Sequence, residues 1–198
     1  MKIIGIDYSM TSPAVAVYDP ERGPFEFKNV KCHFASSKKM HESYVHNNIW
    51  GTRFYPELWA DDIRKYRWFA NWAHRCFADD AFPVDDQDLH IFIEGYSFAS
   101  TGKVFHIAEN TAILKDKVLA YGFEVVPPTV IKKFASGKGN ATKEKMYEAF
   151  QKDNPGTDLC SLLTPRSEKI ISPVSDIVDA YYICQFGWED IKPTLGVS

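Results

Sequence analysis

The order of strand-like and helix-like segments constrains the fold of this chain more than any other feature of its sequence. Residues 1–7, 13–19 and 25–35 carry the short or alternating apolar runs typical of strands, with turn-like residues between the first two. These three segments predict an antiparallel meander. Later apolar runs at 89–94 and 123–128 read as further strands, separated by helical segments. Strands first, then strand–helix alternation, predict an α/β domain whose mixed sheet is packed against helices.

Helical spacing of apolar residues occupies much of the remaining chain. Apolar residues recur at intervals of three and four from Pro56 to Phe77, which predicts a helix. Further helices are predicted at 102–122, 129–135 and 141–153, and from 175 onward. Three segments lack such a period: 36–55 and 153–172 read as loops, and 77–88 as an acidic connector.

The composition is that of a globular protein. With 198 residues, 45% hydrophobic and 25% charged, the chain is long enough for one domain with a substantial core. No apolar run is long enough to span a membrane, and the sequence begins directly with a strand-like segment, so we expect a soluble, cytoplasmic protein.

The four cysteines form no C-x-x-C pair, which argues against a zinc site or disulfide framework. The net charge of −3 argues weakly against a nucleic-acid partner, unless bound cations cancel some carboxylates.

The segment SDIVDAYY, residues 175–182, places two carboxylates in an otherwise apolar helix. Asp176 and Asp179 are three residues apart, so they share one helix face and repel each other unless a cation lies between them. A solvated first helical turn, where the helix dipole favours Asp, is the better explanation of such a pair when it is taken alone.

Two more acids stand at strand ends. Asp7 ends the first predicted strand and Glu94 ends the fourth. If these strands are neighbours, both carboxylates lie together and the last helix can add Asp176 and Asp179. Clustered carboxylate oxygens are the ligands that Mg²⁺ and Mn²⁺ prefer, and two such ions can activate a water and stabilise the leaving oxygen of a phosphodiester.

A basic stretch precedes this helix. Five lysines and one glutamate lie between positions 132 and 145, which makes a local positive patch suited to phosphate. The lysines are Lys132, Lys133, Lys138, Lys143 and Lys145.

Taken in order, four stretches of the sequence resemble the successive motifs of the RuvC family. They are IIGIDYSMTSPAVAVYD, IFIEGYSF, VVPPTVIKKFASGKGNATKEKM and SDIVDAYYIC, and with them the resemblance spans 1–35 and 89–187. The family consists of Holliday-junction resolvases of the ribonuclease H-like superfamily, and this chain resembles a divergent or phage-type member. The resemblance implies a ribonuclease H-like mixed five-stranded sheet with helices on both faces. It also implies a homodimer that cuts four-way junctions with Mg²⁺ or Mn²⁺, two ions per active site, leaving 5′-phosphate and 3′-hydroxyl ends.

The same resemblance implies roles for individual residues. It makes the four acids metal ligands and catalytic residues, Lys143 the basic residue beside the scissile phosphate, and Tyr96 and Phe98 candidates for an aromatic wedge that stacks on an unpaired base. Core packing explains Phe98 almost as well. Gly137 and Gly139 suit a close approach to DNA, or a tight turn. The four acids are Asp7, Glu94, Asp176 and Asp179.

One region departs from the family pattern. Residues 36–88 are longer and richer in aromatic residues than the corresponding part of bacterial resolvases, so we interpret them as an enlarged insertion within a single nuclease domain spanning 1–198. Helical spacing favours core and interface positions over DNA contact for the tryptophans of this region, which are Trp50, Trp59, Trp68 and Trp72.

Other functions compete with junction cleavage. An RNA-processing nuclease of the YqgF type shares the superfamily, but its chains tend to be shorter and the lysine-rich stretch fits it less well. An actin-like ATPase needs two such lobes, for which 198 residues are too few. A non-catalytic DNA-binding relative is disfavoured because all four acids are present. The acids alone distinguish neither DNA from RNA nor a junction from a flap.

Overall fold

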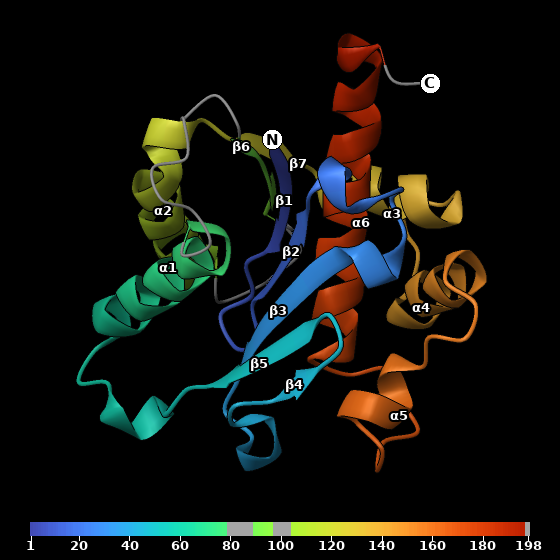
Figure 1. Ribbon diagram of the computed structural model, residues 1–198. Helices are drawn as coiled ribbons and strands as arrows, with labels where there is room; N and C mark the ends of the chain where they lie inside the picture. The colour runs from blue at the N-terminus through green and yellow to red at the C-terminus, as the bar shows by residue number, and fades with distance from the viewer. Residues whose placement is uncertain (79–88, 97–103, 197–198) are drawn as a thin grey trace.

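A single seven-stranded sheet organises the chain (Figure 1). The computed structural model describes residues 1–78, 89–96 and 104–196. In the order β4-β5-β3-β2-β1-β6-β7, the strands are β4 (Val45–His46), β5 (Ile49–Arg53), β3 (Val30–Ser36), β2 (Ala14–Tyr18), β1 (Lys2–Asp7), β6 (Leu89–Glu94) and β7 (Glu124–Val126). The first three strands are antiparallel, as predicted, whereas β6 runs parallel to β1 and β7 parallel to β6.

Helices cover both faces of this sheet (Figure 1). They are α1 (Asp62–Ala78), α2 (Val104–Val118), α3 (Pro128–Ser136), α4 (Lys143–Asp153), α5 (Leu159–Leu163) and α6 (Val174–Ile191). The core on one face joins α6, α4 and α5 to the sheet, and the core on the other joins α1 and α2. The α/β class and the two-sided cover therefore agree with the sequence. Within the described residues, no helix is both long and apolar enough to span a bilayer.

The closest approach between helix and sheet lies at Gly5 of β1. A Cβ atom at this position would overlap the backbone nitrogen of Cys184 and the backbone oxygen of Ala180, both on α6, and would lie 2.8 Å from the Cα of Cys184. The thiol of Cys184 also donates to the carbonyl of Ile3, at 3.3 Å. The helix is thus seated directly on the backbone of the first strand, which brings its first turns beside the end of β1.

The sheet has seven strands rather than five because residues 36–55 are not a loop. β5 pairs parallel with β3 and β4 antiparallel with β5, so this segment extends the sheet by two strands. The two residues of β4 are exposed, and β5 is only partly buried, so neither strand has the apolar pattern of a buried strand.

Four smaller features also differ from the prediction. Residues 27–29 form the 3₁₀ turn η2 (Phe27–Asn29), because Phe27 packs against Phe150 instead of continuing a ladder. The predicted loop at 153–172 contains α5. The helix predicted from Pro56 begins with a separate turn, η4 (Pro56–Leu58), and the helix predicted to 122 ends in η6 (Leu119–Tyr121). The remaining short turns are η1 (Pro20–Arg22), η3 (Lys39–His41) and η7 (Lys192–Leu195).

The tryptophans of the insertion do not share one environment. Trp72 is buried in the core under α1, and Trp59 and Trp68 pack partly buried against Phe54. Trp50 lies on β5, outside both cores, so the core assignment does not hold for it. All four cysteines are free thiols.

We predict that Gly5→Ala destabilises the protein by about 3 kcal/mol or more, because the neighbouring atoms are backbone and cannot rotate away. Gly137→Ala is the matched control. Gly137 has a left-handed backbone, with a φ of 78°, but no atom within 4 Å of the added Cβ, so only backbone strain of about 1–2 kcal/mol is expected. Urea unfolding of both variants measures the difference, and equal losses would contradict the seating of α6 at Gly5.

Candidate metal centre

The parallel pairing of β1 and β6 places two acids at one edge of the sheet. Ile6 is in register with Ile93, so the next residues, Asp7 and Glu94, lie side by side where the strands end. Asp7 is only 8% exposed. Both acids line a recess of about 350 Å³ together with Tyr8, Tyr96 and Thr111, among other residues.

The last helix brings two further acids to this edge. Asp176 lies in the first turn of α6 and is 6% exposed, and Asp179 follows one turn later. The N-cap of α6 is Pro173, with no side-chain capping hydrogen bond, so Asp176 does not cap this helix. The burial of Asp176 also excludes a solvated first helical turn, which two aspartates three residues apart would suggest if considered alone.

The four carboxylates are close enough to act on one another electrostatically. Burial raises the pKa of Asp7 well above its ordinary value, and the charges of Glu94, Asp176 and Asp179 raise it further. Burial first, then Glu94 and Asp176, raises the pKa of Asp179 to about 8. Burial likewise raises the pKa of Glu94 to about 7. Four acids from the first strand, the sixth strand and the last helix therefore form one acidic centre.

Two lysines oppose this negative charge. Lys143, the first residue of α4, lowers the pKa values of Asp7, Asp176 and Asp179. Its Nζ donates to Oγ of Ser175 at 3.1 Å, and this hydroxyl donates to Oδ1 of Asp176 at 3.2 Å. Lys132 on α3 lowers the pKa values of Glu94 and Asp179. The lysine-rich stretch thus contributes two cations beside the acids.

The centre suits a hard divalent cation by its chemistry. All four donors are carboxylates, and Oδ2 of Asp176 is buried without a hydrogen-bond partner, as expected of an atom that awaits a ligand. Across the described residues, no three His, Cys, Asp or Glu side chains stand close enough together to hold a metal ion as they are. Binding would therefore require the carboxylates to draw together, which their mutual repulsion resists until a cation is present.

Comparison with solved structures reveals the same architecture elsewhere. Thermus thermophilus RuvC matches with a TM-score of 0.52 and 13% identity over 100% of this chain and 98% of its own. T. thermophilus RuvC in complex with Holliday junction substrate matches with a TM-score of 0.55 and 13% identity over 94% of this chain and 93% of its own. The chain has the RuvC fold. Comparison of the sequence with known families finds no match, and comparison with curated proteins finds none either.

The RuvC fold confirms the mixed α/β fold that the motifs implied, although the sheet has seven strands and not five, and the low identity fits the divergent member they resemble. The fold alone assigns no role to a residue.

The remaining predicted residues lie at varied distances from the acids. Tyr96 lines the recess of Asp7 and Glu94, and the Nζ of Lys115 lies 5.1 Å from its ring centroid. Phe98 lies outside the described residues. Gly137 has a φ of 78° and ends α3, so the tight turn explains it. A Cβ atom added at Gly139 would lie 3.1 Å from the carbonyl oxygen of Thr129.

Four of the five lysines are exposed: Lys133, Lys138, Lys143 and Lys145. Lys145 pairs with Glu148 at 2.6 Å. Contact with DNA stays a prediction for all five, and Lys132 and Lys143 also lie close enough to the acids to lower their pKa values.

Sequence reasoning missed the hydroxyls of the centre. Ser175 joins Lys143 to Asp176, and the side chains of Ser172 and Ser12 lower the pKa of Asp176 against the effect of burial. Ser175 directly precedes Asp176 in SDIVDAYY, so its position within the motif was the available signal. Ser12 and Ser172 come from loops and give no such signal.

We predict that the double change Asp176→Asn, Asp179→Asn leaves the metal-free protein at least as stable as the wild type, because it removes two repelling charges from a buried site. The rise in melting temperature on adding Mn²⁺ should disappear, since a ligand stabilises only a fold that binds it. Thermal melts with and without Mn²⁺ check both effects. A loss of stability with an unchanged metal response would contradict a metal-binding role for this pair.

The metal-free protein should lose stability as the pH rises from about 4 to about 8. The raised pKa values of Asp179, about 8, and Glu94, about 7, mean that the folded state retains protons which the unfolded chain releases near pH 4. The stabilising contribution of these two protonated acids to the free energy of unfolding is present at low pH. It is lost as the pH rises past their folded-state pKa values. His41, whose pKa burial lowers, acts in the opposite direction below about pH 6.5.

Urea unfolding in EDTA across this range measures the slope. Asp179→Asn should flatten the decline, and saturating Mn²⁺ should do the same in the wild type. A wild-type stability that increases steadily from pH 4 to 8 in EDTA would contradict these assignments.

Proposed function

We propose that this protein is a metal-dependent endonuclease of the RuvC type that hydrolyses phosphodiesters in branched DNA, with four-way junctions as the main substrate. The observation that carries the proposal is the acidic centre of Asp7, Glu94, Asp176 and Asp179 in a RuvC fold. The match to a RuvC structure solved with a Holliday junction substrate supports a branched-DNA substrate. Such an activity belongs to DNA recombination and repair.

The four acids would hold two Mg²⁺ or Mn²⁺ ions. When bound, the ions supply positive charge to the attacking and leaving oxygens of the phosphodiester. Hydrolysis forms a bond from a water oxygen to phosphorus and breaks the bond to the 3′-oxygen, leaving 5′-phosphate and 3′-hydroxyl ends. The water oxygen becomes part of the 5′-phosphate, and a proton released from the water balances the one taken up by the 3′-oxygen.

Lys143 would contribute a fixed positive charge beside the scissile phosphate. Its tether to Asp176 through Ser175 keeps the ammonium at the edge of the acidic centre. A charge held in place before the reaction needs no reorganisation as negative charge develops on the phosphate. Tyr96, on the wall of the same recess, would stack on a base that leaves the duplex next to the cleaved bond.

We further propose that the active form is a homodimer. A four-way junction is resolved by two symmetric cuts, and each chain provides one acidic centre, so two chains are required.

We predict that Asp7→Asn lowers junction cleavage by at least about 10³-fold while junction binding survives or tightens, because a charge that repels phosphate is removed and the shape is kept. Single-turnover cleavage and electrophoretic binding assays on the same junction separate the two effects. Asp190→Asn, which removes an exposed carboxylate at the other end of α6, is the control and should cleave at the wild-type rate. Wild-type cleavage by Asp7→Asn would exclude Asp7 from catalysis.

Substrate and metal should both be selective. Mg²⁺ or Mn²⁺ should support cleavage, EDTA should abolish it, and Ca²⁺ should permit binding without turnover because of its looser geometry. Four-way junction, flap, duplex and RNA–DNA hybrid tested side by side should rank the junction first. Preference for structured RNA would favour the YqgF-type alternative, and binding without cleavage in every metal would favour a non-catalytic relative.

A further inference from the structure

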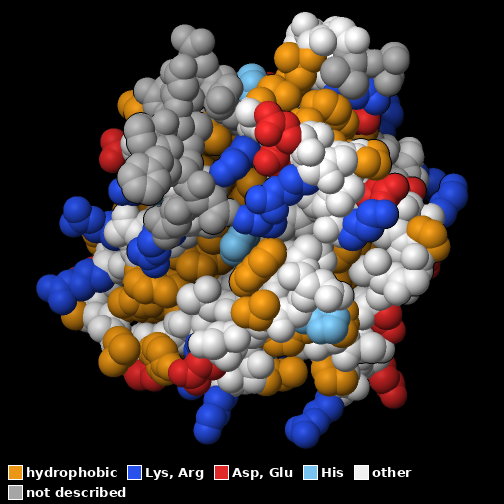
Figure 2. All heavy atoms as spheres, in the orientation of Figure 1, with side chains coloured by type: hydrophobic (Ala, Val, Ile, Leu, Met, Phe, Trp, Pro, Cys, Tyr) orange, Lys and Arg blue, Asp and Glu red, His pale blue; other side chains and the backbone are white. Residues whose placement is uncertain are grey.

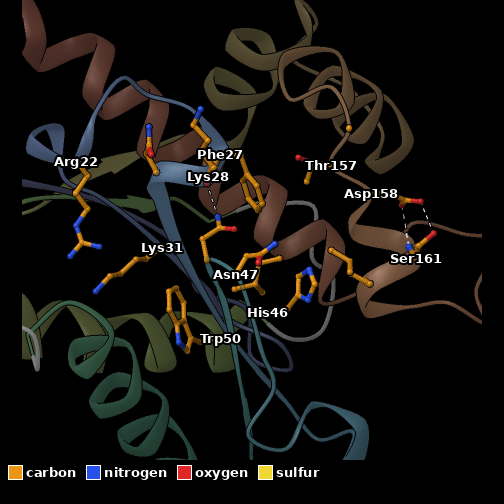
Figure 3. A pocket seen from close by; sticks show the side chains of 15 residues that line it. Arg22, Phe27, Lys28, Lys31, His46, Asn47, Trp50, Thr157, Asp158 and Ser161 are labelled. Atoms are coloured by element: carbon orange, nitrogen blue, oxygen red, sulfur yellow. Dashed lines mark hydrogen bonds between the residues drawn. The ribbon is translucent and has the colours of Figure 1, made fainter.

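A second cleft lies away from the acidic centre (Figure 3). It has a volume of about 760 Å³, within the range of roughly 300–1,000 Å³ typical of ligand sites. Residues from three separate segments, 22–31, 46–50 and 156–162, line it. None of its lining residues belongs to the recess of Asp7 and Glu94.

The sheet register gives its position relative to the acids. Asp7 is in register with Ala14 of β2, and Ala14 is in register with Phe34 of β3. Lys31, which lines the cleft, lies three positions before Phe34 on that strand. The cleft is therefore at the other end of β3, where η2, β5 and α5 meet.

One wall of the cleft is positively charged. Arg22, Lys28 and Lys31 line it, and Figure 2 shows Lys and Arg side chains gathered over β2 and β3 on this face. Arg22 pairs with Asp19 at 3.5 Å and Lys28 with Glu26 at 2.6 Å. Because the side chains of Arg22 and Lys28 are 51% and 75% exposed, each pair contributes little to stability, and the cations can exchange their partners for phosphate oxygens at small cost.

Beside these cations stands a half-buried aromatic ring. Trp50 lines the cleft, and His33 stacks beneath it with ring centroids 5.1 Å apart and planes 19° apart. The Nζ of Lys31 lies 6.0 Å from the Trp50 ring centroid. An indole supported by a stacked imidazole and flanked by cations is a platform for a planar base with its phosphate nearby.

The base of the cleft is held in place by hydrogen bonds. Nδ2 of Asn48 donates to the carbonyls of Phe27 and Val30 at 2.6 and 2.7 Å, which ties the β4–β5 turn to the segment that carries Lys28 and Lys31. Asn47, at the tip of this turn, has a φ of 50° and presents an exposed amide. The cations, the ring and the amide are thus arranged in advance, which lowers the entropic cost of binding.

The acid that lines this cleft is engaged elsewhere. Asp158 stands on the opposite wall, where Figure 3 shows it beside Ser161. It accepts from the backbone nitrogen and the hydroxyl of Ser161 at 3.1 and 2.5 Å, and from the hydroxyl of Tyr147 at 3.1 Å. These hydrogen bonds hold the carboxylate of Asp158 against its own wall, across the cleft from Arg22, Lys28 and Lys31.

We infer that this cleft binds a segment of single-stranded nucleic acid, with phosphates on Arg22, Lys28 and Lys31 and an unpaired base on Trp50. A duplex would present only its phosphates, because its bases are stacked on each other and cannot use the ring. The inference rests on the proposed DNA substrate and adds a second contact, away from the acids, for an unpaired strand of a branched molecule.

The test is binding of fluorescently labelled dT12 in EDTA, measured by anisotropy, so that cleavage plays no part. Trp50→Leu, which keeps an apolar side chain, should weaken binding by at least about fivefold. Arg22→Gln with Lys31→Gln should weaken it about tenfold at low salt and reduce the slope of log affinity against log salt by about 1.4, for two lost phosphate contacts. Melting temperatures of all variants establish that they fold.

The matched control is Lys117→Gln with Lys152→Gln, which removes the same charge from exposed positions on α2 and α4 outside the cleft. Binding should change by less than about twofold in this control. A second measurement needs no variant: dT12 carrying 5-bromodeoxyuridine, irradiated on the wild-type protein, should crosslink to the peptide that contains Trp50.

Several outcomes would overturn the inference. These are unchanged dT12 binding by folded Trp50→Leu, an equal loss in the control pair, and a crosslink map that omits the Trp50 peptide. If the cleft variants lose affinity for a blunt 12-base-pair duplex as much as for dT12, the cleft is a duplex surface instead. If dTMP or inorganic phosphate competes with labelled dT12 as effectively as unlabelled dT12 does, the cleft is a small-anion pocket. Because metal is absent throughout, failure of junction cleavage by the wild type would leave these results unaffected.

Discussion

The contact between α6 and β1 at Gly5 determines where the chemistry of this protein can lie. Only a residue without a side chain lets the backbone of Ala180 and Cys184 come so near the strand. Asp7 follows Gly5 by two residues, and Asp176 and Asp179 precede Ala180 on the helix, so one packing contact sets the separation of acids from the two ends of the chain. The parallel register of β1 and β6 adds Glu94. A strand displaced by one residue would turn Asp7 to the opposite face of the sheet.

The acidic centre is costly to the fold and is held together by its surroundings. Buried carboxylates lose hydration, and each raises the pKa values of its neighbours. Lys143, Ser175 and Lys132 offset part of that cost without neutralising it. The remaining repulsion makes the site receptive to a cation, so the instability of the metal-free centre and its affinity for metal have the same physical cause.

The sequence predicted those parts of the molecule whose pattern is local. Asp7 and Glu94 end apolar runs, and Asp176 and Asp179 share a helix face, so each could be placed on its element and the elements brought together by topology. The β4–β5 hairpin could not be predicted, because its exposed residues give no alternation. Phe27 was predicted to lie in a strand because an alternating apolar pattern does not distinguish a paired strand from a turn. In the structure it lies in a turn, and its aromatic side chain packs on Phe150. The cleft around Trp50 joins three distant segments, which no periodicity links.

The distribution of the four acids along the chain also bears on biosynthesis. Asp7 is made early, Glu94 midway, and Asp176 and Asp179 only near the end of the described chain. A nascent polypeptide, or a fragment released before α6, has the strands that carry Asp7 and Glu94 but lacks the helix that completes the set. The acidic centre therefore forms only after α6 has been synthesised and has packed on β1, and products that lack α6 cannot contain it.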